Sequence, residues 1–292
     1  MVSDYKTGEI LCMVSTPSYD PQNPPVSVEG SEYEGVYINR CISSVYTPGS
    51  VFKPVTLAAA LETPDMTANR KFFCSGVLDL DGDAVTCPSA HGEQDIRRVF
   101  ANSCNCAFAE LSLELGAETI REYAEAYGFL SAHKLDGITT AAGGFDMPET
   151  AAETAWAGIG QYNDLVSPFS LLRFVSATAN GGLLKEPHIL QGKAYEKKAG
   201  SRLIKADTAS ELKEMMRYNV TDSYGVWNFP DHAVCAKTGT AEVGDGTSHA
   251  WITGFIDDEE YPFAFTVIVE NGGGGLAVAA PVASAVLRAA CH

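Results

Sequence analysis

The sequence has few basic residues for its length. Its 292 residues include 20 Lys and Arg against 37 Asp and Glu, which gives a formal net charge of −17 at pH 7. That charge has the wrong sign for following a phosphate backbone or an anionic membrane surface. Nucleic acid is therefore not expected as a partner.

Long apolar runs are also missing. No stretch approaches the ~20 apolar residues that a membrane-spanning helix needs, and the N-terminus lacks the basic-then-apolar pattern of a secretion signal. We expect the chain as given to be soluble. A hydrophobic content of 46% is enough for one large domain or two closely packed subdomains.

Two further patterns are absent. The glycines 272–275 are not followed by the Lys-Ser or Lys-Thr pair of a nucleotide-binding loop. Six scattered histidines give no support to a Ser-His-Asp triad. The sequence also contains no internal repeat and no low-complexity tract.

Eight cysteines are present, at spacings that are irregular for a small disulfide scaffold. Cys104 and Cys106, taken with Cys74 and Cys87, are weak evidence for zinc, because the two-residue step and the lack of a second close pair do not fit common zinc motifs. We therefore expect no metal, and no cofactor.

One pair of cysteines has a more specific context. Cys74 and Cys87 flank Asp81 and Gly82, a turn signal that predicts a hairpin over residues 77–86. Such a hairpin would bring the two side chains close. A Cys74–Cys87 disulfide and two small buried side chains are both open interpretations.

The order of predicted elements indicates an α+β fold. A strand at 9–15 and a loop at 16–34 precede a mostly helical part, and strands at 234–243, 250–256 and 262–270 with a final helix at 281–290 follow it. Within the helical part, helices are predicted at 55–62, 95–115, 119–127, 168–179 and 206–218. This order predicts a sheet closed by both chain ends beside a largely helical region.

The first candidate for chemistry is the pair Ser50 and Lys53. Pro48 and Gly49 break the preceding structure, and Pro54 is tolerated only in a first turn, so a helix should begin near Ser50. Residues three apart on a helix are neighbours, which would bring the Lys53 amine near the Ser50 hydroxyl. Lysine can act as the base only if burial or a nearby cation lowers its pKa. The alternative is a capping serine beside a solvated lysine.

The second candidate is Ser103 with Asn105, an S-x-N pattern. Its hydroxyl could pass a proton and its amide could orient a peptide, although such residues also commonly cap or interrupt helices. The third candidate is the strand segment Lys237, Thr238, Gly239 and Thr240. There a cation and a hydroxyl could hold a carboxylate, while the glycine permits close approach of another backbone.

The tripeptide of the third candidate also occurs near the N-terminus, as Lys6, Thr7 and Gly8. Asp4 before it and a strand directly after it predict a hairpin turn there. We expect no catalytic role for this copy.

Taken in order, S-x-x-K, S-x-N and K-T-G make the sequence resemble the penicillin-binding proteins and serine β-lactamases. Further segments of the chain extend the resemblance over nearly its whole length: 6–11, 18–21, 39–40, 48–53, 158–161, 179–182 and 250–255. It is strongest to the transpeptidase domain of the monofunctional, class B-like penicillin-binding proteins. The resemblance implies an antiparallel five-stranded sheet flanked by helices, with sheet portions at about 1–17 and 232–292 and a helical portion at about 35–231.

The resemblance also implies roles for individual residues. Ser50 would be the acylated nucleophile, Lys53 the base, and Ser103 a proton relay to the leaving amine. Asn105 would orient substrate and Lys237 with Thr238 would bind the terminal carboxylate. The backbone N–H groups of Ser50 and Thr240 would form the oxyanion hole. Cys104 at the middle of the second motif departs from the family pattern.

The expected activity is D,D-transpeptidation of peptidoglycan stem peptides, with β-lactams as inhibitors. A D,D-carboxypeptidase, a class D-like β-lactamase and a non-catalytic β-lactam sensor are the alternatives. By the same resemblance, a membrane anchor and a pedestal domain would precede this domain and hold it at the extracytoplasmic face of a bacterial membrane. Cell-wall synthesis proteins would be its partners.

Overall fold

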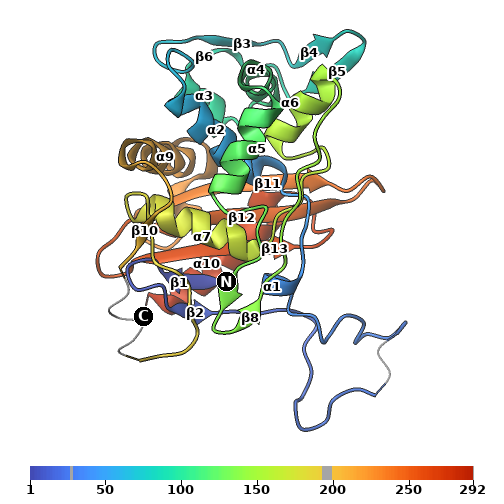
Figure 1. The fold of residues 1–292 in the computed structure, drawn as a ribbon, viewed down its shortest axis with the longest axis vertical. Coiled ribbons are helices and arrows are strands. Elements are labelled where there is room, and N and C mark those ends of the chain that lie inside the picture. The colour runs from blue at the N-terminus through green and yellow to red at the C-terminus, as the bar shows by residue number, and fades with distance from the viewer. Residues whose placement is uncertain (27–28, 193–198, 292) are drawn as a thin grey trace.

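The computed structural model describes residues 1–26, 29–192 and 199–291. At its centre lies a five-stranded antiparallel sheet with the strand order β11-β12-β13-β1-β2. The strands are β1 Val2–Asp4, β2 Ile10–Cys12, β11 Val234–Glu242, β12 Ser248–Ile256 and β13 Phe263–Val269. Segments from both sides of the helical part therefore build one sheet, as the sequence predicts (Figure 1).

The three long strands form the predicted meander. β12 is buried from Ala250 to Ile256, which agrees with its nearly continuous apolar run. β1 has only three residues, too few for a pattern of alternating burial to indicate it from sequence. It pairs with β13 in the register Val2↔Phe265.

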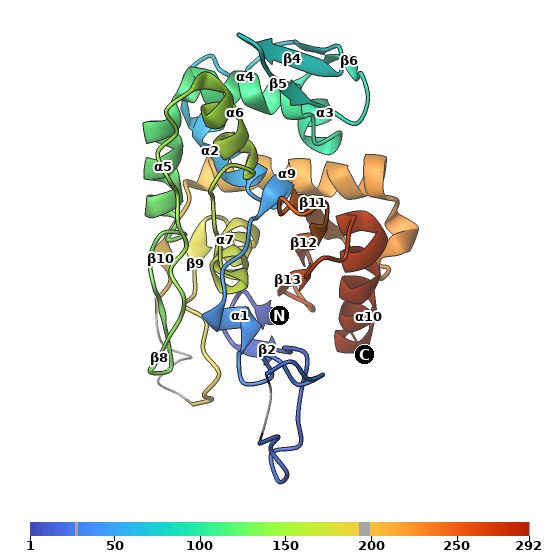
Figure 2. The same ribbon diagram turned by 90° about the vertical axis from the view of Figure 1, so that its right-hand side faces the viewer.

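The described helices cover both faces of this sheet or build the helical part beside it. They are α1 Arg40–Ser43, α2 Lys53–Glu62, α3 Ile96–Ala101, α4 Asn105–Leu115, α5 Ala117–Ala126, α6 Ala151–Ile159, α7 Pro168–Ala179, α9 Ala206–Tyr218 and α10 Ala280–Ala290. α7 packs against β12 and β13, and α10 lies on the other side of the sheet (Figure 2). α7 and α9 have the bounds predicted from sequence.

One predicted helix is wrong. The pattern over 95–115 indicates a single helix, but the chain breaks between α3 and α4, where Ser103 adopts φ +50°. A left-handed serine costs roughly 1–3 kcal/mol, so the surrounding contacts must hold it in place. The break turns Ser103 toward the sheet instead of leaving it on a continuous helical face.

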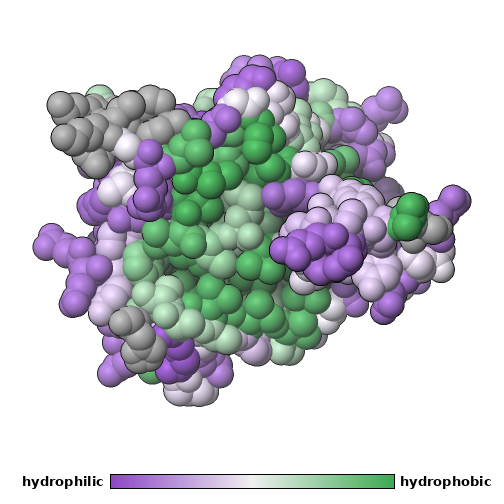
Figure 3. Space-filling model, turned by 90° about the horizontal axis from the view of Figure 1, so that it is seen from below, coloured by the Kyte–Doolittle hydropathy of each residue, from purple (hydrophilic) through white to green (hydrophobic). Residues whose placement is uncertain are grey.

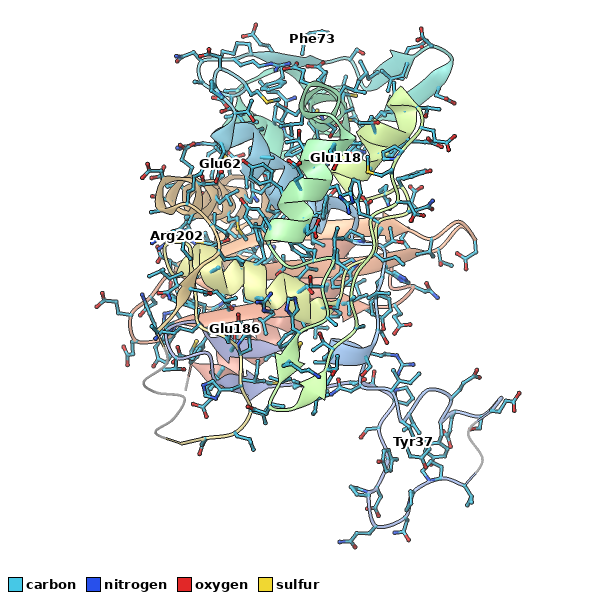
Figure 4. The ribbon with its side chains drawn as sticks, viewed as in Figure 1. Tyr37, Glu62, Phe73, Glu118, Glu186 and Arg202 are labelled. Atoms are coloured by element: carbon cyan, nitrogen blue, oxygen red, sulfur yellow. The ribbon has the colours of Figure 1, made fainter. Side chains whose placement is uncertain are left out.

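Short two-stranded sheets complete the helical part. They are β3 Phe72–Cys74 with β6 Gly92–Gln94, β4 Val77–Leu80 with β5 Asp83–Thr86, β7 Lys134–Leu135 with β8 Ile138–Thr139, and β9 Leu183–Leu184 with β10 Ser201–Arg202. The β4–β5 hairpin has Asp81 and Gly82 as its two-residue turn, both at positive φ, which confirms the hairpin predicted at 77–86. Phe73 of β3 is an exposed apolar side chain at this end of the molecule (Figure 4).

The other features of the molecule are an irregular segment, an apolar cavity and a hydrophobic face. The described residues of 16–34 contain no helix or strand, and Tyr37 lies in the segment that projects from the body (Figure 4). Between α10 and the strands β1, β2 and β13, Val2, Val14 and Val286 help to line an apolar cavity of about 600 Å³. Viewed from below, the molecule presents a broad hydrophobic face (Figure 3). None of the described helices is both long enough and apolar enough to span a bilayer.

Candidate active site

A cleft of about 720 Å³ runs along β11, at the edge of the sheet, where the helical part meets it. Its lining combines residues of all three sequence motifs with residues that no motif indicates: Ser50, Thr86, Cys87, Pro88, Asn102, Ser103, Asn105, Trp156, Ile159, Gln161, Thr238, Gly239, Thr240 and Glu242. The fold thus brings the three motifs together.

Ser50 lies in a 3₁₀ turn, η1 Gly49–Val51, immediately before α2. The α-helix itself begins at Lys53 with Pro54 in its first turn, so Ser50 precedes the helix rather than capping it. Gly49 at φ +55° lets this turn approach β11 closely: a Cβ there would lie 2.8 Å from the Thr240 carbonyl oxygen. This close approach places Ser50 against β11.

Lys53 is fully buried, and its amine points at the second motif. Nζ donates to the Ser103 carbonyl at 2.6 Å, to the Ser103 hydroxyl at 3.1 Å and to Asn105 Oδ1 at 2.7 Å. Among the described residues, no hydrogen bond joins Lys53 to the Ser50 hydroxyl. Catalytic hydrogen bonds are often long without substrate and tighten in its complex. Burial lowers the pKa of Lys53 to about 7, which suits a base at neutral pH.

Lys237 approaches the same serine from the sheet. This residue is also fully buried, and its Nζ donates to the Ser103 hydroxyl at 2.9 Å and to the Thr238 carbonyl at 2.9 Å. Burial, and then the positive charge of Lys53, hold the pKa of Lys237 well below its usual range. Ser103 therefore bridges two amines, which fits a proton relay better than a helix cap.

The backbone of β11 also faces the cleft. The Thr238 N–H donates to the Tyr224 hydroxyl at 3.2 Å and the Glu242 N–H donates to Gln161 Oε1 at 3.0 Å, so both point away from β12. N–H groups alternate in direction along an antiparallel strand. The N–H of Thr240, midway between them, must point the same way, toward the turn that carries Ser50.

Asn105 links the site to the β4–β5 hairpin. Besides accepting from Lys53, its amide donates to the Thr86 carbonyl at 2.8 Å. Asn105 therefore contacts both the helical part and the hairpin.

Two residues near β11, Tyr224 and Gln161, were given no role from the sequence. Gln161 follows Gly160, the left-handed C-cap of α6. Tyr224 carries no local signal, because its contact with Thr238 depends entirely on tertiary packing.

The second copy of the tripeptide lies far from this cleft. Lys6, Thr7 and Gly8 form the turn between β1 and β2, where the Asp4 carboxylate accepts from the N–H groups of Lys6 and Thr7. Gly8 adopts φ +90°. The predicted hairpin turn is confirmed.

The Cys74–Cys87 disulfide is not formed in the structure: all eight cysteines, each of them described, are free. The hairpin does bring both residues to one place, as the sequence indicates. However, the turn before α4 supplies two more sulfurs there, and Cys87 Sγ lies 3.8 Å from Cys104 Sγ and 3.6 Å from Cys106 Sγ. Cys74 and Cys87 are therefore two members of a larger group of cysteines, which also includes Cys104 and Cys106.

The lowered pKa of Lys53 predicts a pH profile for acylation by penicillin. The rate should rise as pH increases through about 7 and level off above it, because only the neutral amine can accept the Ser50 proton. Since Lys53 and Lys237 share Ser103, the apparent pKa belongs to the pair. Stopped-flow acylation rates from acid to alkaline pH would measure it, and a rate that falls over this interval would contradict the role given to Lys53.

The two copies of the tripeptide provide a matched comparison. Lys237→Met keeps most of the buried side chain but removes the amine at Ser103, and should slow acylation about 10²-fold or more. Lys6→Met removes contacts with Asn180 and with the Tyr5 ring, outside the cleft, and should leave the rate unchanged. Equal effects of both changes on the acylation rate would show that the K-T-G of β11 has no special role.

Comparisons with known proteins agree with this geometry. Residues 1–288 match the penicillin binding protein transpeptidase domain family. The chain is 30% identical to the peptidoglycan D,D-transpeptidase PbpA of Mycobacterium tuberculosis over 97% of its own length and 65% of PbpA. It is 32% identical to the stage V sporulation protein D of Bacillus subtilis, over 97% of this chain and 47% of that protein.

Solved structures show the same fold. The ceftriaxone acyl-enzyme complex of penicillin-binding protein A from M. tuberculosis superposes with a TM-score of 0.87 at 28% identity, covering 100% of this chain and 73% of that one. The imipenem acyl-enzyme complex of the same protein gives 0.87 at 29% identity, with 100% and 72% coverage. The chain belongs to the penicillin-binding protein transpeptidase domain family.

Proposed function

We propose that this domain is a serine-type D,D-transpeptidase that cross-links peptidoglycan stem peptides through an acyl-enzyme on Ser50, and that β-lactams inhibit it by acylating the same serine. The observation that carries the proposal is the convergence of Ser50, the buried Lys53 and the edge strand β11 on one cleft. The relative from M. tuberculosis bears the name of this activity, and structures of penicillin-binding protein A are β-lactam acyl-enzymes, which supports it.

In the first step, the donor peptide lies extended along the free edge of β11, ending in D-Ala-D-Ala. The Ser50 hydroxyl attacks the carbonyl carbon of the penultimate D-Ala while Lys53 Nζ takes its proton. The carbonyl oxygen becomes an oxyanion held by the N–H groups of Ser50 and Thr240. Each such donor contributes about 3 kcal/mol to the transition state.

In the second step, the tetrahedral intermediate collapses and the C–N bond to the terminal D-Ala breaks. The proton on Lys53 reaches the leaving amine through the Ser103 hydroxyl, 3.1 Å from Lys53 Nζ and 2.9 Å from Lys237 Nζ. An acceptor amine then attacks the Ser50 ester, loses a proton by the reverse route and restores the Ser50 hydroxyl. The product is a new peptide bond between two stems.

The terminal carboxylate of the donor binds at Thr238 and Thr240. Both line the cleft, whereas Lys237 is fully buried with its amine directed at Ser103 and the Thr238 carbonyl. Lys237 therefore acts from behind the strand through its hydrogen bonds to Ser103 and Thr238, while the hydroxyls make the direct contact. This arrangement divides a role that the sequence pattern assigns to Lys237 and Thr238 together.

The test is product analysis with a depsipeptide or thioester donor that mimics the stem terminus, in the presence of a D-amino acid acceptor. The proposal expects a Ser50 adduct and transfer of the acyl group to the amine. Hydrolysis alone would indicate a carboxypeptidase, many turnovers of nitrocefin a β-lactamase, and acylation without transfer a sensor. Any of these three results would overturn transpeptidation.

The site of action follows from the substrate. Stem peptides ending in D-Ala-D-Ala are cross-linked outside the cytoplasm, so we place this domain at the extracytoplasmic face of the membrane. The anchor, the pedestal domain, the domain limits at 1–292 and the cell-wall synthesis partners are expectations that rest on the family resemblance. Detection of the whole protein with a β-lactam probe that does not cross the membrane would test the location.

A further inference from the structure

A cluster of cysteine and histidine side chains lies at the back of the catalytic cleft. Cys74, Cys87, His91 and Cys104 each offer one ligand atom, and these four atoms all lie within 4.8 Å of one another. Cys87 and His91 are four residues apart in the chain, whereas the fold must bring Cys74 and Cys104 to them. The sequence pattern favoured no metal, because of the two-residue step from Cys104 to Cys106 and the lack of a second close pair, and it did not include His91.

The fold gives each of the four a fixed position. Cys74 ends β3 and pairs with Gly92 of β6, which sets His91 beside it. The Cys87 N–H donates to the Gly76 carbonyl at 2.9 Å, so Cys87 is held against the start of the β4–β5 hairpin. Cys104 is the residue before α4, in the turn that also carries Ser103. The β3–β6 sheet, the β4–β5 hairpin and the turn before α4 therefore meet at the four ligand residues.

The spacing of the sulfur atoms fits a tetrahedral metal. Two thiolates bound to one zinc at about 2.3 Å lie roughly 3.8 Å apart. Cys87 Sγ lies 3.8 Å from Cys104 Sγ. A disulfide would need about 2.05 Å. Cys106 Sγ is also near, 3.6 Å from Cys87 Sγ, but is directed to the Val85 carbonyl at 3.7 Å.

The surrounding groups suit a thiolate and a neutral imidazole. Cys87 Sγ accepts backbone N–H bonds from Asn105 at 3.1 Å and Cys106 at 3.4 Å, as metal-bound thiolates do in their outer shell. His91 Nδ1 is buried and has no hydrogen-bond partner among the described residues. A metal ion would satisfy this nitrogen.

We propose that Cys74, Cys87, His91 and Cys104 bind one zinc ion in a closed structural site. Three thiolates and an imidazole are the donor set of tetrahedral zinc, and four protein ligands leave no position for a water nucleophile. On binding, the three thiols release their protons to solvent. This site is distinct from the acyl-transfer machinery, and its occupancy does not depend on the proposed function.

The role of the ion is to fix the turn that carries the second motif. Cys104 lies between Ser103, which bridges the two lysines, and Asn105, which accepts from Lys53. Zinc would tie this turn to the β3–β6 sheet and to the β4–β5 hairpin, and so hold the left-handed Ser103 in place. Zinc binding would explain why a cysteine occupies the middle position of the second motif, because the side chain of Cys104 would face the metal rather than the substrate.

Metal analysis of the purified protein, kept reduced throughout, tests the site directly. We expect about one zinc per chain, and cobalt substitution should give the thiolate charge-transfer and d–d bands of a tetrahedral site. Cys74→Ser, Cys104→Ser and His91→Ala should each lower zinc affinity at least about tenfold. Cys12→Ser and Cys291→Ser, which alter free cysteines outside the cluster, should retain the metal, and so should Cys106→Ser.

Several results would overturn the proposal. A protein that carries no zinc, and takes up neither zinc nor cobalt when titrated, has no such site. A disulfide among these cysteines in protein kept reduced would also exclude it. Loss of metal in Cys106→Ser together with retention in His91→Ala would contradict the ligand set.

A second measurement tests the role of the ion. Removal of zinc by a chelator should lower the melting temperature and slow penicillin acylation about tenfold, and added zinc should restore both. Unchanged acylation in metal-free protein would refute the positioning role. Zinc binding in a protein that penicillin never labels would instead refute the proposed function and leave the site standing.

Discussion

Ser50→Ala is expected to abolish covalent labelling by penicillin, with at least about a 10⁴-fold loss of acylation rate. The reason is that the cleft then contains both lysines and the oxyanion donors but no nucleophile to form the ester. Intact-mass spectrometry after incubation with penicillin measures the adduct directly. The wild type should gain the mass of one β-lactam, while the variant should gain none.

The control for this change is Ser201→Ala, at an exposed position on β10 remote from the cleft. It should label like the wild type. Ser50 is only partly buried, and its loss should leave the melting temperature within a few degrees. An adduct that persists in Ser50→Ala would mean that another side chain is acylated, and the assignment of the nucleophile would be wrong.

Lys53→Met is expected to slow acylation by about 10³-fold, which is within the range for loss of a general base. Methionine keeps a long apolar side chain in a site that is fully buried, so the change removes the amine with little change in packing. The partners of Nζ, the Ser103 carbonyl and Asn105 Oδ1, then lose a donor. Some loss of stability is expected from this.

The pH profile separates catalysis from stability in this variant. If Lys53 is the base, the residual acylation of Lys53→Met should lose the rise through about pH 7 that is expected of the wild type. Circular dichroism melting identifies any unfolded fraction. If folded Lys53→Met acylates at the normal rate, Lys53 is not the base, and Lys237, the other amine at Ser103, becomes the candidate.

Sequence reasoning predicted best those elements whose signals are local. α7 begins at Pro168 after Ser167, whose hydroxyl accepts from the Ser170 N–H, and each residue is the type expected at its position. α6 had a comparable signal, since Thr150 and Glu153 form a capping box, but its helix was not predicted. The sequence therefore does contain a local signal for the start of α6, namely this capping box.

Other features depend on contacts that no local pattern reveals. The residues around Ser103 have a helical pattern, and the left-handed conformation of that serine accompanies tertiary hydrogen bonds to Lys53 and Lys237. The motif residues of the site could be named from sequence because their order and context matched a family. Tyr224 could not, since tertiary structure alone brings it to Thr238, and the same holds for the approach of Cys74 and Cys104 to Cys87 and His91.

The construction of the sheet from distant segments has a consequence for biogenesis. The amine of Met1 donates to the Thr266 carbonyl, a contact between residues 265 positions apart. Strands that are this far apart in sequence pair slowly, because chain entropy is lost in closing the long loop before the favourable contacts form. During synthesis, a nascent chain that has not yet released β13 cannot join β1 and β2 to β11 and β12, so the sheet beside Ser50 is incomplete. Capacity to capture an antibiotic would therefore appear only at the end of folding, which makes covalent labelling a sensor of the fully assembled domain.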